Sequence, residues 1–268
     1  MPRRTLTLRR AGSCVRCATS LAVGSEAVWD SDARTVTCLA CERSSPPPAS
    51  SSAPLTTGQA GASAGREHER RRQNREAQIK AKHPRTAALR LALGGAPQQE
   101  VAFKQGQVGE ESVGALLDER TADGPAVVLH DRRMPGSRGN IDHLAIAPTG
   151  VYVIDARAWQ GKVALCTPLL DRKKLLIAGR DRTSLIDGLD RQVAAVRAAI
   201  GDDVDDVAVR GVLCFTRAEL PLLRTLTIRS HMLLYRKALS KRINQEGPLS
   251  PNAIEQIARK LDSNLPPA

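Results

Sequence analysis

The sequence NIDHLAIAPTGVYVIDAR, residues 140–157, predicts the centre of the fold. Apolar runs on both sides of a Pro-Thr-Gly turn signal, in which glycine can adopt positive φ, predict a β-hairpin. If the turn is centred on Pro148 and Thr149, antiparallel pairing places Asp142 opposite Asp155, with Cβ atoms roughly 4.5–5.5 Å apart. Like charges at that distance repel each other unless a cation, a proton or a basic group lies between them. The spacing therefore suggests a divalent-metal site.

A register shifted by two residues gives another interpretation of the same hairpin. It would place Asp142 opposite Arg157, which is an ordinary cross-strand ion pair of small energy. In either register, Arg157 shares a strand face with Asp155, because it lies two residues further along the strand. The side chain of His143 then points to the opposite face from Asp142, and we expect it to be structural. The spacing alone leaves both registers open.

The segments around the hairpin carry a resemblance to a known family. GQVGEESVGALL precedes it at residues 106–117, and AWQGKV follows it at residues 158–163. Together they resemble the nuclease-related domain family, NERD, with a Gly-x-x-Gly-Glu helix start, an Asn-Ile-Asp-His strand, a Pro-Thr-Gly turn, and a strand ending in acidic-x-Lys before Trp-x-Gly. The match is close over residues 106–163 and looser to about Phe215. Several separated motifs in the right order make the resemblance specific.

The resemblance implies membership of the PD-(D/E)XK nuclease-like superfamily. The implied fold is an α/β domain with a mixed central sheet flanked by helices, as in restriction endonucleases, with a metal held at one edge. Carried over to this sequence, Glu110 is the helix-borne carboxylate, Asp142 the central metal ligand and Asp155 the second ligand. The implied cofactor is Mg²⁺ or Mn²⁺, which supports phosphodiester hydrolysis.

The sequence departs from the family pattern at one position, because Arg157 stands where the superfamily carries lysine. A guanidinium keeps its charge, so it can steady a phosphoryl oxygen but cannot activate water. Three outcomes stay open: Arg157 substitutes in a transition-state role, the activity is weak, or a catalytically inactive domain binds nucleic acid or protein. Gln160 and Gln192 are further candidates to reach the site, and Lys162 to contact phosphate.

A second motif lies near the amino end. Its four cysteines have the C-x2-C, C-x2-C spacing of a four-thiolate zinc site, and they are Cys14, Cys17, Cys38 and Cys41. Apolar segments at 27–29 and 35–37 predict a hairpin that joins the two pairs. Residues 1–43 therefore form a zinc-ribbon-like module, too small to fold without its metal.

Disulfides or a redox pair are the alternatives to zinc. The first ten residues lack a signal peptide, so we expect a cytoplasmic chain with reduced thiols. Cys166 and Cys214 lie in apolar stretches, and we expect both to be buried core thiols. Apolar runs never reach the length of a membrane span.

The charge of the chain favours a polyanionic partner. Its 268 residues carry a formal net charge of +12, and 41% of them are hydrophobic, enough for a core. Neutralising phosphates releases counterions, so nucleic acid is the expected partner, DNA more than RNA. A general compositional bias towards arginine is the alternative explanation of the charge.

The remaining sequence organises the chain into segments. Residues 44–65, rich in Ser, Pro, Gly and Ala, predict a disordered linker, and residues 66–84 a basic polar helix. That helix either lies along a phosphate backbone or is a solvated connector. The nuclease-related domain spans residues 100–265.

Within that domain the later segments alternate between strand and helix patterns. An amphipathic helix over 184–200 separates strands at 175–177 and 207–215, and the last of these is apolar enough for a central strand. A further strand around 232–235 and a closing helix over 251–261 complete the predicted α/β sheet with a crossover helix.

Overall fold

The computed structural model describes residues 3–15, 17, 19–30, 35–43, 54–93, 98–137, 139–167, 172–201, 207–221 and 224–268. These residues form two compact units, Met1–Pro54 and Leu55–Ala268. Each unit has its own sheet and its own hydrophobic core.

The first unit is small and built on short strands. Its elements are β1 (Arg3–Thr7), β2 (Gly12–Ser13), β3 (Ser20–Leu21), β4 (Glu26–Asp30), β5 (Thr35–Cys38) and α1 (Leu39–Arg43). The central strand β4 pairs antiparallel with β1 and with β5, and the β4–β5 pair is the predicted hairpin. Its core consists of Leu8, Cys14, Leu21 and Ala27. So few buried side chains cannot offset the conformational entropy of the segment without an added constraint.

The second unit is built around a mixed eight-stranded sheet. Its strands are β6 (Val127–Arg133), β7 (Asn140–Ala147), β8 (Gly150–Cys166), β9 (Lys174–Ile177), β10 (Arg180–Asp181), β11 (Val209–Glu219), β12 (Leu226–Ile228) and β13 (His231–Tyr235). The long strand β8 pairs antiparallel with β7 along its first part and with β9 along its last part. On its other edge β8 runs parallel to β11, which in turn runs parallel to β13. The prediction that residues 207–215 contain a central strand is confirmed.

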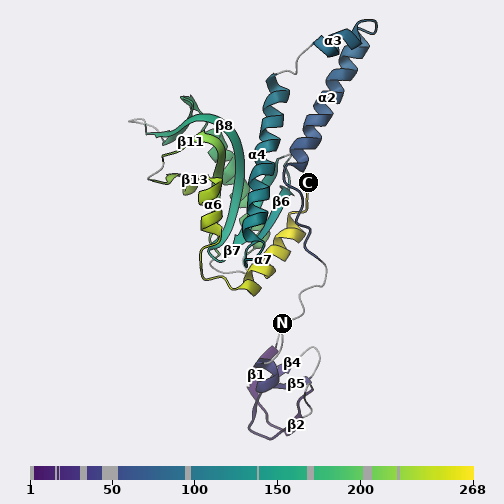
Figure 1. Cartoon of the computed structure of the whole chain (residues 1–268). Coiled ribbons are helices and arrows are strands. Elements are labelled where there is room, and N and C mark those ends of the chain that lie inside the picture. Colours follow the sequence, from purple (N-terminus) through teal and green to yellow (C-terminus); the bar gives the residue numbers. More distant parts are fainter. Residues whose placement is uncertain are drawn as a thin grey trace. The chain divides into compact units, whose positions relative to one another are not determined.

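Helices cover both faces of this sheet (Figure 1). One core cluster joins the sheet to α4 (Gln98–Thr121) and α6 (Arg236–Ile243). The other joins it to α5 (Ser184–Ile200) and α7 (Pro251–Asn264). Apolar faces of helix and sheet are thereby buried against each other, as the predicted fold class requires.

The central hairpin adopts the unshifted register. His143 pairs with Ile154, and Ala147 pairs with Gly150 across the turn. The alternative register, with Asp142 opposite Arg157, is therefore wrong. Gly150 has φ +128°, and a Cβ there would lie 2.4 Å from the carbonyl oxygen of Ala208, so the turn requires glycine.

The Gly-x-x-Gly-Glu motif lies inside a helix and not at its start, because α4 begins at Gln98. The predicted helix start is therefore wrong. Gly109 is in the motif for a packing reason, since a Cβ there would lie 2.8 Å from the Cβ of Ala158. The missing side chain allows α4 to approach β8 closely, and this brings the next residue, Glu110, to the sheet.

The second unit begins earlier in the chain than the sequence predicts. Residues 44–53 of the predicted linker lie outside the described residues, as does Arg16. From Leu55 onward the chain contacts the unit: His130 N donates to Thr57 O at 2.6 Å, and the Arg132 guanidinium donates to Thr56 O at 2.5 Å. The linker prediction is therefore too long at its carboxyl end.

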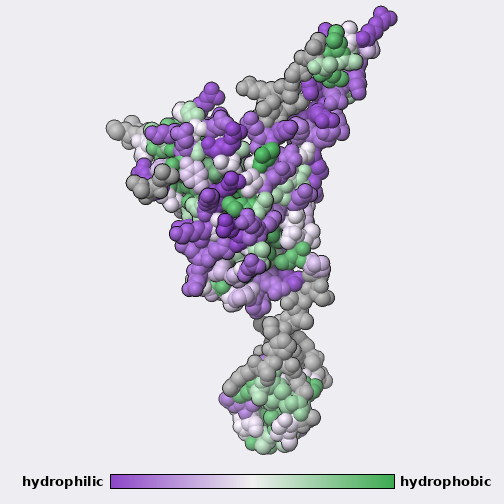
Figure 2. Space-filling view, viewed as in Figure 1, coloured by the Kyte–Doolittle hydropathy of each residue, from purple (hydrophilic) through white to green (hydrophobic). Residues whose placement is uncertain are grey.

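The basic helix predicted over 66–84 is α2 (Ala62–Lys82), which is followed by α3 (Ala87–Leu93). No side chain of α2 is buried, and hydrophilic residues cover it along its length (Figure 2). Among the described parts of the chain, no helix is both long and apolar enough to cross a membrane.

Candidate functional site

The first unit brings its four predicted ligands together. The sulfur atoms of Cys14, Cys17, Cys38 and Cys41 all lie within 4.8 Å of one another. Backbone N–H groups donate to two of the sulfurs, from Cys38 to Cys14 and from Cys41 to Cys38, each at 3.3 Å. A hydrogen bond donated to sulfur favours the thiolate, which is the form that binds zinc. Four sulfurs at this spacing fit a tetrahedral zinc site.

The remaining cysteines differ from each other. Cys214 is buried in the sheet, and burial raises the pKa of its thiol to about 12. Cys166 is exposed at the end of β8. The prediction of a buried core thiol is therefore wrong for Cys166, because β8 extends beyond the helices that cover the sheet centre.

The carboxylates of the second unit lie where β7 parts from β8. The last paired residues are His143 and Ile154, and beyond them the Asp142 carboxylate accepts a hydrogen bond from Ala156 N at 2.8 Å. On this edge β8 has no strand partner among the described residues until β9 joins it at Val163. Asp155 lies on this part of β8, beyond the last residue that pairs with β7, and its side chain is buried.

Arg157 lies beside both aspartates. Its Nη2 donates to Asp155 Oδ2 at 2.7 Å and lies 2.6 Å from Oδ1, while its Nη1 lies 3.9 Å from Asp142 Oδ2. The Asp155 side chain is only 3% exposed, so this ion pair is shielded from water. The compensating positive charge that the carboxylate pairing requires is therefore supplied by a guanidinium.

Glu110 on α4 completes the cluster. Burial raises the pKa of Glu110 to about 7, against the opposing effect of the Arg157 charge. Burial also raises the pKa of Asp142 well above its ordinary value, and the charges of Asp155 and Glu110 raise it further. A similar desolvation raises the pKa of Asp155 despite Arg157. One guanidinium does not neutralise three carboxylates, so the cluster retains affinity for positive charge.

The two clusters differ in how closely their ligand atoms approach. Within the described ranges, only the four cysteines form a group of three or more metal-ligating side chains whose ligand atoms lie within 4.8 Å of one another. The oxygens of Glu110, Asp142 and Asp155 gather around Arg157 but do not meet that distance. As hard oxygen donors they are nevertheless the ligand type that Mg²⁺ and Mn²⁺ prefer.

Residues 105–216 match the model of a protein family described as the nuclease-related domain, NERD. The second unit contains a NERD domain. The matched segment includes Glu110, Asp142, Asp155 and Arg157, and it ends within β11. The mixed α/β sheet agrees with the PD-(D/E)XK nuclease-like superfamily to which NERD domains are assigned. No curated protein and no solved structure matches the chain.

A cavity of about 390 Å³ lies beside Arg157, the residue that contacts Asp155. Arg157 and Gln160 line it from β8, and Arg180 and Arg182 line it from the region of β10. The Arg182 guanidinium stacks 4.5 Å from the centroid of the Trp159 ring. The sequence analysis missed both Arg180 and Arg182, although two arginines directly after a predicted strand were an available signal.

The other candidates named from the sequence fall in different places. Gln192 Nε2 donates to the carbonyl oxygen of Asn140 at 3.3 Å, so this side chain reaches the start of β7, close to Asp142. Lys162 is exposed on β8. His143 is fully buried, and its Nδ1 lies 2.8 Å from His130 Nδ1. This packing agrees with the structural role expected for His143.

Proposed function

We propose that the NERD domain hydrolyses phosphodiester bonds in nucleic acid with the help of Mg²⁺ or Mn²⁺. The observation that carries this proposal is the convergence of three carboxylates from α4, β7 and β8 at the open edge of β8. Burying several carboxylates together is unfavourable, so a structural role alone gives no reason for the arrangement. A hard divalent cation would compensate this cost.

Each residue of the cluster has a distinct role in this proposal. Glu110, Asp142 and Asp155 would hold the ion, which when bound supplies Lewis-acid polarisation of the phosphoryl oxygen and a lowered pKa for the attacking water. Arg157 exchanges its ion pair with Asp155 for a non-bridging phosphate oxygen. It cannot act as a general base, since its guanidinium stays protonated.

The surroundings of the cluster favour a phosphodiester substrate. Arg180 and Arg182 place two further positive charges in the cavity beside Arg157, and no carboxylate of the described residues lines that cavity. The N–H donors of a guanidinium group match the geometry of phosphate oxygens. A nucleic-acid strand in this cavity would therefore meet hydrogen-bond donors from both β8 and the region of β10. The net charge of +12 acts in the same direction over a longer range.

A second candidate function is nucleic-acid or protein binding without cleavage. The contacts of Arg157 Nη2 with both oxygens of Asp155, at 2.6 and 2.7 Å, favour it. These oxygens are the ones that a metal ion would need. If the guanidinium holds them permanently, the domain keeps a basic cavity but has no place for the ion.

The test is an assay of the purified full chain on DNA and on RNA, with added Mg²⁺ or Mn²⁺. We expect cleavage by the wild type, and loss of cleavage in Asp142→Asn. The matched control is Asp123→Asn, which removes the charge of an exposed aspartate in the turn after α4 and leaves cleavage unchanged. Equal cleavage by wild type and Asp142→Asn would reject the assigned residues. Binding without cleavage in every condition would support the second candidate function.

A further inference from the structure

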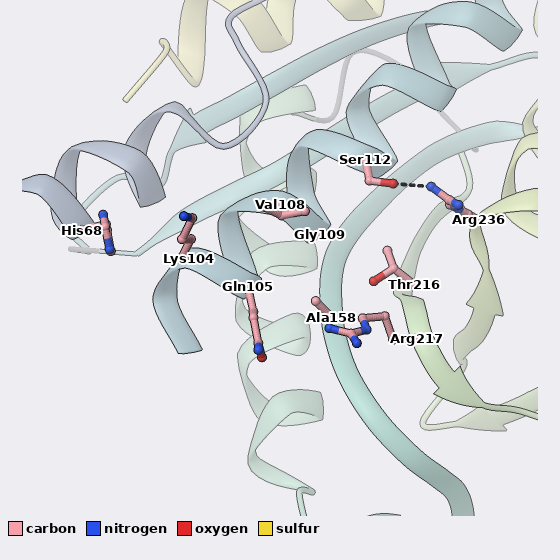
Figure 3. Close-up of a pocket in the computed structure, with 10 residues that line it drawn as sticks. All are labelled: His68, Lys104, Gln105, Val108, Gly109, Ser112, Ala158, Thr216, Arg217 and Arg236. Carbon is pink, nitrogen blue, oxygen red and sulfur yellow. Dashed lines mark hydrogen bonds between the residues drawn. The ribbon is translucent and has the colours of Figure 1, made fainter. Parts of the chain in front are cut away.

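A second cavity of the NERD domain, of about 600 Å³, lies between α4 on one side and β11 and α6 on the other (Figure 3). Its volume falls in the range of about 300–1,000 Å³ typical of small-molecule sites. Residues from α2 and β8 also line it. Five elements therefore converge on a space that the proposed hydrolysis does not use.

The lining of this cavity is positively charged. Lys104 extends from α4, Arg217 from β11 and Arg236 from the start of α6, and His68 of α2 adds a fourth basic side chain. None of the lining residues is a carboxylate. Arg236 donates a hydrogen bond to Ser112 Oγ, which fixes its guanidinium at the cavity wall (Figure 3).

These cations lack the acidic partners that other arginines of the unit have. Arg132 pairs with Asp262, and Arg157 pairs with Asp155. In the described part of the chain, no carboxylate forms an ion pair with Lys104, Arg217 or Arg236. Gathering like charges without a counter-charge is unfavourable, so the cavity favours an anionic ligand.

The rest of the wall contains both polar side chains (Gln105, Ser112 and Thr216) and an apolar part. Val108 is 55% exposed, although valine is usually buried, and Gly109 and Ala158 continue the same surface. An inorganic anion would leave this surface in water. A ligand that combines a phosphate with an apolar ring satisfies both parts of the lining. No aromatic side chain other than His68 lines the cavity, so stacking gives little preference among the bases.

The cavity adjoins the one beside Arg157. Gln105 of α4 and Ala158 of β8 line both of them. Alternate residues of β8 point in opposite directions, so Arg157 faces the carboxylates while its neighbour Ala158 faces the second cavity. Because Gln105 and Ala158 line both cavities, the two cavities are neighbours, and adjacent nucleotides of one strand can occupy them.

We propose that this cavity binds one unpaired nucleotide of a nucleic-acid strand. Lys104, Arg217 and Arg236 contact the phosphate, and Val108 and Ala158 contact the base or sugar. The nucleotide is unpaired because a base held in a duplex cannot reach a cavity between α4 and β11 without leaving its stack. Its position next to a scissile phosphate rests on the proposed function, whereas the binding itself does not.

The experiment measures binding of deoxyadenosine monophosphate to the full chain by calorimetry, without added divalent metal. We expect this probe to bind at least about 10-fold more tightly than deoxyadenosine or inorganic phosphate, since each lacks one half of the ligand. Lys104→Ala and Arg217→Ala should each weaken binding about 10-fold, as expected for one lost charge-assisted hydrogen bond. Both side chains are exposed, so neither change disturbs the core. The control is Lys241→Ala, which removes an exposed charge of α6 outside the cavity and leaves binding unchanged.

Several results would overturn the proposal. Deoxyadenosine binding as tightly as the monophosphate would remove the role of the cations. Equally tight binding of inorganic phosphate would mean that the cavity binds anions without recognising the base or sugar. Unchanged affinity in both variants would mean that the probe binds outside this cavity. The Asp142→Asn variant separates the two proposals, because it should lose cleavage while retaining the nucleotide. Retained nucleotide binding without any cleavage in the wild type would reject only the hydrolysis.

Discussion

The cysteine cluster and the carboxylate cluster are both candidate metal centres, but they are assembled differently. The four sulfurs come from two C-x2-C turns in one small unit and already lie within 4.8 Å of one another. The carboxylates come from α4, β7 and β8, and Arg157 lies among them. In the first cluster the four sulfur atoms are close enough to bind one ion together. In the second cluster the guanidinium of Arg157 lies among the carboxylates that would bind an ion.

The different assembly of the two clusters indicates a different role for a bound ion in each unit. The described part of the first unit has a small core, and zinc bound to the four cysteines would supply the missing free energy of folding. The second unit has two large core clusters around its sheet. We therefore expect an ion in the first unit to serve stability and an ion in the second to serve chemistry.

The largest expected effect follows removal of one sulfur. Cys38→Ser should abolish zinc binding and unfold the first unit, since structural zinc contributes about 10–16 kcal/mol of apparent binding free energy in small domains. Zinc content by atomic absorption and dispersion of amide signals by NMR would measure it. Exposed Cys166→Ser is the control and should change neither. If the first unit stays folded without zinc, its fold does not depend on the metal and the prediction is wrong.

The next effect concerns a buried arginine outside the carboxylate cluster. Arg132 is fully buried and binds Asp262 and the carbonyl oxygens of Thr56 and Leu265. Arg132→Met should destabilise the second unit by about 3–5 kcal/mol, because it leaves a partner charge uncompensated. Urea denaturation would measure the loss. Exposed Arg133→Met on the same strand should cost less than about 0.5 kcal/mol; a similar loss in both variants would contradict the prediction.

A smaller effect is expected at Arg157, whose side chain is 28% exposed. Arg157→Met should destabilise the unit by about 2 kcal/mol, since Asp155 loses its partner but can take up a proton, which its raised pKa favours. Added Mn²⁺ should restore part of this stability by binding the vacated carboxylates, and should act less on the wild type. Denaturation with and without Mn²⁺ would show this, with Arg180→Met as the exposed control. No difference in the response to Mn²⁺ would mean that the carboxylates do not form a metal site.

The Arg157→Lys variant tests the carboxylate cluster through cleavage activity instead of stability. Lysine restores the family pattern and can lose its proton when it is desolvated, so we expect cleavage to increase about 10-fold or more. The assay is the same one used for the wild type, with DNA and RNA. Unchanged cleavage would show that Arg157 already supplies all that this position contributes.

The smallest effect concerns Cys214, a thiol outside the cysteine cluster. Burial raises its pKa to about 12 in the folded chain, above an ordinary value near 9. Its contribution to stability is therefore fully present below about pH 9 and declines as the pH rises towards 12, by up to about 1.4 kcal/mol per pH unit. Denaturation of wild type and Cys214→Ala at pH 8 and pH 10 isolates this contribution. An equal decline in both proteins would contradict it.

Local patterns predicted several elements correctly. The amphipathic pattern over 184–200 gives α5, because burial of one helical face against the sheet needs only a period of 3.6 residues. The apolar runs and the Pro-Thr-Gly turn predicted the hairpin, while two registers stayed open; the structure adopts the one in which Ala147 pairs with Gly150. The four cysteines were predicted from spacing alone, since both C-x2-C turns are local.

Other features could not be read from local sequence. The helix start of α4, the early docking of residues 55–61 and the exposure of Cys166 depend on contacts with distant elements. The contribution of Arg180 and Arg182 to the cavity depends on how β9 and β10 fold back along β8. Local sequence patterns do not predict contacts between segments that are far apart in the chain.

The sequence by itself determined which candidate ligands and charged groups this protein has. They are four thiols suited to zinc, the carboxylates of a NERD domain, and an arginine in place of lysine. Only the tertiary structure decided that this arginine lies against both aspartates and that Glu110 comes near them because Gly109 packs closely on β8. It also decided that basic side chains with no acidic partner among the described residues line a second cavity. The physical reason is that ligand identity is a property of single residues. Charge balance, in contrast, depends on distances between side chains that are far apart in the chain.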